Sequence, residues 1–146
     1  MEKSGNYFHL INHTADAAFD IRADSLENLF TEAAKSMYSL LFEELPASSS
    51  QKTDLALSAY SVEELLVSFL NELLYLISVK KRILYPIILL KIDSTEKSIR
   101  LNCRAGSHKI SARKLARLTE IKAVTYHQLN IKRTDKGFYT RLVFDL

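Results

Sequence analysis

The sequence predicts an α+β domain: a two-layer sandwich in which two main helices pack on one face of a mixed, largely antiparallel sheet. Two segments each carry one apolar stripe at helical spacing, and several strand-like segments surround them. A helix and a sheet each bury one apolar face against another element, so two layers are the simplest arrangement. A chain of 146 residues is long enough for one such domain, spanning residues 1–146.

The first expected elements are two strands joined by a polar turn. Residues 17–23 alternate apolar side chains such as Phe19 and Ile21 with polar ones such as Asp20, which is the period of a half-buried strand. We expect another strand over residues 7–11, immediately before the turn.

Two amphipathic helices follow. The first is predicted to begin at Asp24, which stands three residues before Glu27 in the spacing of a capping box, and to run for about four or five turns. The second begins at Ser61, three residues before Glu64. The apolar stripes are Leu26, Leu29, Phe30, Ala33, Met37, Leu40 and Leu41 in the first helix, and Val62, Leu65, Leu66, Phe69, Leu70, Leu73, Leu74 and Ile77 in the second.

The remaining segments favour loops and strands. Residues 44–52 contain a proline and three serines and predict an exposed loop, while alternation over residues 55–59 predicts a short strand. Later strand-like segments cover residues 85–92, 98–104, 120–133 and 138–146. Residues 134–137 would join the last two as a hairpin.

Motifs of common nucleotide-binding proteins and hydrolases are absent from the sequence. It contains no GxGxxG or GxxxxGK[ST] loop, no HExxH and no GxSxG. The single cysteine, Cys103, cannot form an internal disulfide and is most simply a buried, inert residue, so a reducing compartment is expected. Without a signal-like N-terminus or an apolar run of about 20 residues, we expect a cytoplasmic protein without membrane contact.

The charge of the chain does not identify a partner. A formal net charge of +3 is too small to indicate RNA binding by itself. Basic residues gather at 80–82 and again between 109 and 122, with few aromatic residues beside them. Such runs are usually solvated surface, and contact with RNA or a partner protein is the alternative interpretation.

The turn formed by residues 13–16, with the sequence HTAD, is the first candidate site. In the ordinary interpretation, Asp16 or Thr14 accepts hydrogen bonds from nearby backbone amides in the turn. In the functional interpretation, Asp16 is a metal ligand, and His13 is a further ligand, an orienting group or a phosphate contact.

The chain end is the second candidate. Asp145 lies on the opposite strand face from Phe144, and a terminal aspartate is usually only solvated. If the fold brings Asp16 and Asp145 together, their carboxylates repel and favour a proton or a cation between them. Oxygen ligands without thiolates favour calcium, magnesium or manganese, with water and main-chain oxygens such as that of Leu146 completing the coordination.

Residues 120–127 form the third candidate because they combine diverse polar groups in one strand-like segment. Lys122 could pair with a carboxylate or a phosphate, although a solvated lysine on the sheet is the more ordinary interpretation. His127 is more often a hydrogen-bonded strand histidine than a metal ligand.

Taken together, these segments resemble the archease family. HTAD at 13–16 with SLENLF at 25–30 is similar to its opening, residues 62–76 to its second helix, residues 121–127 to its signature strand, and VFDL at 143–146 to its end. The blocks follow the family's order and span nearly the whole chain. Two positions depart from the pattern: Asn12 stands where an aspartate often precedes HTAD, and Ala23-Asp24 replaces a glycine often found before the first helix.

The resemblance implies an accessory protein rather than an enzyme. It would activate a GTP-dependent, RtcB-type RNA ligase in tRNA splicing or RNA repair by promoting guanylylation and multiple turnover of the ligase. Indirect contact with tRNA is a further interpretation, and direct contact with RNA stays open. It would bind a divalent metal such as calcium at Asp16, Asp145 and the terminal carbonyl of Leu146, with Lys122 as a further site residue. Two alternatives stay open: a chaperone-like interaction module, and a small RNA-binding protein without a functional metal site.

Overall fold

The order of helices and strands confirms the predicted α+β class. The structure, a computed structural model, describes residues 5–13, 15–126 and 129–146. The helices within these ranges are α1 (Leu26–Leu41), α2 (Val62–Ser78) and α3 (Ala112–Leu115). The strands are β1 (Tyr7–His13), β2 (Asp16–Ala23), β3 (Lys52–Ala59), β4 (Arg82–Ser94), β5 (Ile99–Lys109), β6 (Ala123–Val124), β7 (Lys132–Thr134) and β8 (Gly137–Asp145).

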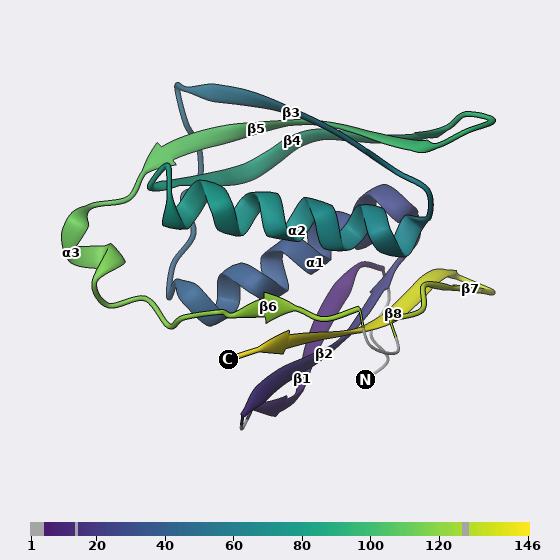
Figure 1. Ribbon diagram of the computed structural model, residues 1–146, viewed down its shortest axis with the longest axis horizontal. Helices are drawn as coiled ribbons and strands as arrows, with labels where there is room; N and C mark the ends of the chain where they lie inside the picture. Colours follow the sequence, from purple (N-terminus) through teal and green to yellow (C-terminus); the bar gives the residue numbers. More distant parts are fainter. Residues whose placement is uncertain (1–4, 14, 127–128) are drawn as a thin grey trace.

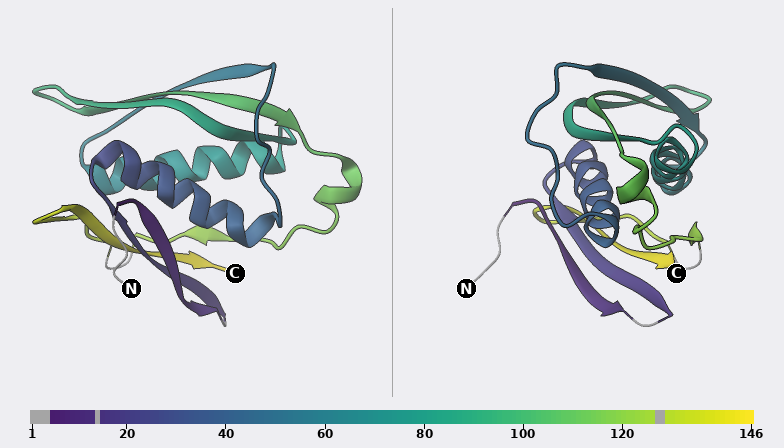
Figure 2. Two further views of the ribbon diagram at one scale, coloured as in Figure 1. Left: turned by 180° about the vertical axis from the view of Figure 1, so that it is seen from behind. Right: turned by 90° about the vertical axis from the view of Figure 1, so that its left-hand side faces the viewer.

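The strands form two sheets rather than the single sheet that we predicted. One sheet has the order β1-β2-β8-β6, with β7 also paired to β8, and the other has the order β3-β5-β4. Every pair of neighbouring strands within the two sheets is antiparallel, so neither sheet is mixed. Helices α1 and α2 lie between the two sheets, which gives three layers (Figures 1 and 2).

The third layer exists because the helices bury more than one stripe. In α1, Ala34 and Tyr38 are fully buried although they lie outside the predicted stripe. The Tyr38 hydroxyl donates a hydrogen bond of 3.0 Å to the carbonyl of Leu84 in β4, which ties α1 to the three-stranded sheet. The other side of α1 packs against β2 and β8 of the five-stranded sheet. The buried surface of α1 is therefore wide enough to contact both sheets.

The helix starts agree with the sequence to within one residue. Ser61 caps α2 as predicted, since its hydroxyl accepts a hydrogen bond from the Glu64 amide at 3.1 Å. The predicted cap of α1 was wrong: Ser25 caps the helix by accepting from the Asn28 amide at 3.1 Å. Asp24 instead accepts a hydrogen bond from the Asn28 side chain at 2.7 Å, because it lies one residue too early to reach the free amides.

The prediction of a continuous strand over residues 120–133 was also wrong. Among the described residues of this segment, only those of β6 and β7 lie in strands. Its other described residues are irregular chain, and apolar side chains among them, such as Ile121 and Ile131, pack against the core. The short helix α3, which precedes the segment and is capped by Ser111, was not predicted. A backbone without a ladder needs other partners, and the Ile131 amide finds one in the Glu63 carboxylate of α2 at 2.9 Å.

Aromatic side chains dominate the centre of the molecule. Phe19 of β2 meets Phe144 of β8 edge to face with ring centroids 5.9 Å apart, and Phe30 of α1 meets Phe69 of α2 at 6.0 Å. All four rings are almost completely buried. Phe19 and Phe144 mark the inner face of β2 and β8, so the residues that alternate with them in these strands must point outward.

Among the described residues, no helix combines the length and apolar character needed to cross a membrane.

Candidate metal centre

Strands β2 and β8 bring the two predicted acidic residues together. Asp16 opens β2 and Asp145 closes β8, and the antiparallel ladder places them directly opposite each other. The register is held by buried pairs further along, including Ala17 with Phe144 and Phe19 with Leu142. A slip by one residue would turn these apolar side chains out to solvent, so packing in the core determines the position of the acidic pair.

The two carboxylates lie on the same, outer face of the sheet. Residues directly opposite in a ladder share a face, and the neighbouring Ala17 and Phe144 point into the core. The Leu146 amide donates to the carbonyl of Ala15 at 3.3 Å, which makes the acidic pair a non-hydrogen-bonded one. In such pairs the Cα atoms are about 4.5 Å apart and the side chains approach most closely.

The chain end is held on both sides. Strand β8 lies between β2 and β6, with the C-terminus beside β6 (Figure 1). The carbonyl of Asp145 accepts a hydrogen bond of 2.8 Å from the Lys122 amide, and that of Val143 accepts one of 3.1 Å from the Thr125 amide. Asp145 is therefore fixed at a three-segment junction rather than at a frayed terminus.

The acidic pair is suited to a hard cation. Directly opposed like charges destabilise a sheet by about 1 kcal/mol or less, and among the described residues no ion pair offsets the charge of Asp16 or Asp145. The two opposed carboxylates offer oxygen donors, which calcium, magnesium and manganese prefer. The described residues contain no cluster of three acidic, histidine or cysteine side chains, so water would complete the coordination.

The structure also places the backbones of two other predicted site residues, His13 and Lys122. The backbone of His13 ends β1 opposite Ala17, next to the start of β2. Lys122 contacts Asp145 through its backbone amide, while its side chain is exposed and forms no ion pair with a described carboxylate. His127 lies outside the described residues.

Comparison with known proteins assigns the family. Residues 8–146 match the model of the archease protein family. The chain belongs to the archease family. An archease from Methanosarcina mazei is 30% identical over 146 residues, which is the whole of both chains. An archease from Pyrococcus abyssi is 28% identical over 135 residues, which covers 92% of this chain and 94% of the relative.

A solved structure supports the same assignment. The solution structure of protein 1598 from Methanobacterium thermoautotrophicum superimposes with a TM-score of 0.76 at 25% sequence identity. The match covers 95% of this chain and 98% of the other. The archease family model matches residues 8–146, which include all of β2 and β8. The acidic pair therefore lies within the part of the chain that the family shares, and not in an appended segment.

Reasoning from the sequence missed the backbone partners of the archease acidic pair and a polar network further along the same two strands. On the same outer face, Asp20 of β2 lies opposite Arg141 of β8. Asp20 accepts hydrogen bonds from the Tyr139 hydroxyl and from Arg141 Nε, the latter at 3.2 Å. Partial burial by itself would raise the pKa of Asp20, but these two donors outweigh it and leave the pKa below the ordinary value. Strand alternation would have revealed this network once the register was known.

Proposed function

We propose that this chain is an accessory protein that activates a GTP-dependent, RtcB-type RNA ligase in tRNA splicing or RNA repair. Membership of the archease family supports the accessory role in RNA ligation. The observation that carries the proposal furthest is the direct pairing of Asp16 with Asp145, two remote residues with the same charge on one face. A protein gains little from such a pair unless a ligand uses it.

The proposed ligand is a divalent cation, calcium or else magnesium or manganese. Asp16, Asp145 and the terminal carbonyl of Leu146 would hold it. When bound, the ion would supply positive charge that complements the triphosphate during guanylylation of the ligase. Asp16 and Asp145 sit at the edge of the molecule on partly exposed strand ends, so a partner protein can approach them without displacing the core.

The partner in this proposal is the ligase, which carries out the joining of RNA ends; this chain does not catalyse that step. Lys122 is suited to a phosphate or to a carboxylate of the partner because its side chain is exposed while its backbone is fixed to Asp145. His13 and His127 remain candidates for contacts at the same edge.

Multiple-turnover ligation with a matched ligase tests this function. We expect Asp16→Asn combined with Asp145→Asn to reduce ligation to about the rate of the ligase alone, because the cation site is lost while side-chain volume is kept. A ligase that already carries its guanylyl group should complete a single turnover equally well with either protein. Calorimetric titration with calcium, magnesium and manganese should show binding to the wild type and none to the variant.

The matched control is Asp93→Asn with Glu96→Gln, which makes the same change of charge on the exposed β4–β5 hairpin. This control should activate and bind metal as the wild type does. Full activation by the Asp16/Asp145 variant would refute the metal-dependent mechanism and favour a metal-independent interaction module. Absence of activation by the wild type, with a ligase shown to be active, would refute the accessory function itself.

A further inference from the structure

The outer face of the five-stranded sheet carries tyrosines and cations in register. Tyr7 of β1 lies opposite Arg22 of β2, Arg22 lies opposite Tyr139 of β8, and Tyr139 lies opposite Lys132 of β7. Directly paired residues share a face, so these four form one row across four strands, about 14 Å long. Arg22 and Lys132 are exposed, and the tyrosines are half-buried.

A second row runs parallel to the first, about 7 Å away. It contains His9 of β1, Asp20 of β2 and Arg141 of β8. The negative charge of Asp20 is already engaged by Arg141 and by the Tyr139 hydroxyl. The two rows therefore present an excess of positive charge beside aromatic rings.

Stacking is already used on this face. The Arg22 guanidinium carbon lies 4.3 Å from the centroid of the Tyr139 ring. A guanidinium over a ring has a second surface on which a further planar group can stack. Nucleobases stack on arginine planes and on tyrosine rings in proteins that bind single strands.

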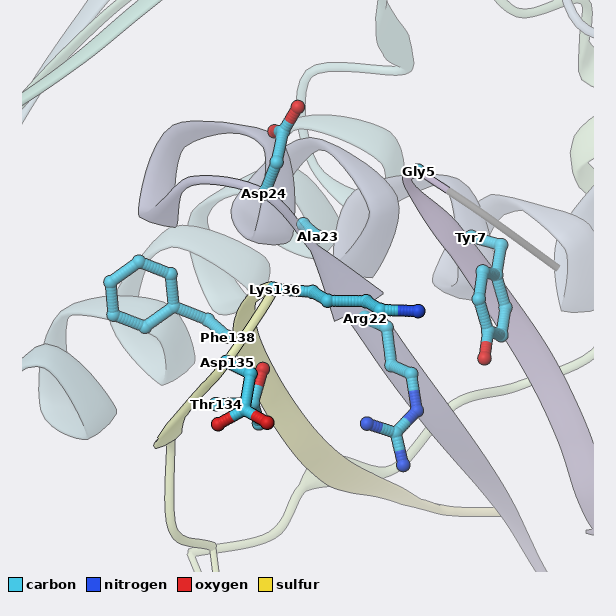
Figure 3. A pocket seen from close by; sticks show the side chains of 9 residues that line it. All are labelled: Gly5, Tyr7, Arg22, Ala23, Asp24, Thr134, Asp135, Lys136 and Phe138. Carbon is cyan, nitrogen blue, oxygen red and sulfur yellow. The ribbon is translucent and has the colours of Figure 1, made fainter.

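A pocket of about 400 Å³ lies at the end of the first row, between the start of β1, the end of β2 and the β7–β8 turn. Figure 3 shows the Lys136 side chain extending toward Tyr7, while the Arg22 guanidinium lies below Lys136 in the view. The Asp24 carboxylate points away from them in the same view, and it accepts a hydrogen bond from the Asn28 side chain. Asp135 also lines the pocket, so its charge offsets one of the two cations. The remaining positive charge beside the Tyr7 ring suits a phosphate joined to a base.

We propose that this outer face binds single-stranded RNA directly. Tyr7 and Arg22 would stack with bases, with the Tyr139 ring supporting the Arg22 guanidinium, while Lys132, Lys136 and Arg141 would contact phosphates. A duplex keeps its bases stacked inside and cannot use the rings in this way. The proposal is independent of the cation site, because its first row lies at the opposite end of β2 and β8 from Asp16 and Asp145, and no residue of the face belongs to that site.

Fluorescence anisotropy with a labelled RNA strand of about 12 nucleotides, without ligase, tests the proposal. We expect the wild type to bind this strand more tightly than the duplex of the same sequence. Arg22→Gln with Lys136→Gln should weaken binding about tenfold, because one stacking plane and one phosphate contact are lost, and it should reduce the logarithmic salt slope by about 0.7, as for one phosphate contact. Lys80→Gln with Lys97→Gln makes the same change of charge on exposed turns elsewhere and should leave affinity within about twofold of the wild type.

A second pair of variants separates stacking from charge. Tyr7→Ala should weaken binding about tenfold, whereas Tyr7→Phe keeps the ring and should bind as the wild type does. Lys132→Gln with Lys136→Gln provides a charge variant that leaves the Arg22–Tyr139 stack intact, and it should also bind weakly. Equal losses in the Lys80/Lys97 control, equal affinity for duplex and single strand, or a Tyr7→Ala protein that binds normally would each overturn the proposal. If the face serves the ligase instead, its variants will lose activation while keeping RNA affinity, which also overturns it.

Discussion

At the scale of single residues, Gly137 shows how closely the β7–β8 turn approaches the end of β2. Its φ of +140° is one that residues with a side chain rarely adopt. A Cβ atom built there would collide with the Ala23 carbonyl oxygen and would lie 2.7 Å from the Cα atom of Asp24. Backbone atoms cannot rotate away, so both strain and collision act on the same position.

We therefore predict that Gly137→Ala lowers the free energy of unfolding by about 2–4 kcal/mol, measured by urea denaturation. Gly5→Ala is the matched control, because Gly5 also has a positive φ, of +82°, but a Cβ there meets no atom within 4 Å. It should cost about 1 kcal/mol or less. Similar losses in the two variants would show that the backbone angle alone matters and that the close approach does not.

At the scale of elements, α1 depends on a polar contact that its apolar spacing could not reveal. Tyr38 is completely buried, and burial raises the pKa of its phenol, so the hydroxyl stays a donor at any ordinary pH. It donates to the Leu84 carbonyl, just where the β4–β5 register is interrupted. The irregular ladder leaves this carbonyl in need of a partner, and α1 supplies it.

Tyr38→Phe should consequently lower the free energy of unfolding by about 1–3 kcal/mol, since a buried carbonyl loses its partner. Urea denaturation measures the loss, and amide hydrogen exchange should show faster opening of β4 than of β2. Tyr75→Phe in α2 is the control, because Tyr75 is exposed and its replacement should change stability by less than about 0.5 kcal/mol. A neutral Tyr38→Phe would show that water or a shift of the chain satisfies Leu84.

Local sequence patterns predicted most helices and strands. The predictions failed where the structure of a segment depends on its contacts with distant segments. The serine cap and apolar spacing fixed α2, and alternation fixed β2, because both depend on neighbours in the chain. Residues 120–133 looked like one strand, but of those that the structure describes only Ala123 and Val124, and then Lys132 and Arg133, find a ladder partner. Side-chain preference cannot reveal whether a neighbouring strand is available, and it missed the division into two sheets for the same reason.

At the scale of the whole molecule, the candidate metal centre depends on a register that sequence reasoning could suggest but not determine. Asp16 and Asp145 were singled out by residue type and by family resemblance. Their pairing follows from the packing of Phe19 and Phe144 in the core. The hydrogen bonds from Lys122 and Leu146 that complete the junction come from backbone, which leaves no mark on the sequence.

Because this junction joins segments that are remote in the sequence, a cation bound there should stabilise the entire fold. We predict that millimolar calcium raises the melting temperature of the wild type, since a ligand that binds only the folded state shifts the equilibrium by mass action. With calcium present, the wild type should be more stable than Asp145→Asn. When a chelator removes the metal, the free energy of unfolding of Asp145→Asn should equal that of the wild type or exceed it by about 1 kcal/mol or less, because a like-charge contact is removed. Asp93→Asn should follow the wild type under both conditions. Calorimetric melting curves measure the crossing, and parallel curves with and without calcium would show that the carboxylates are only neighbours.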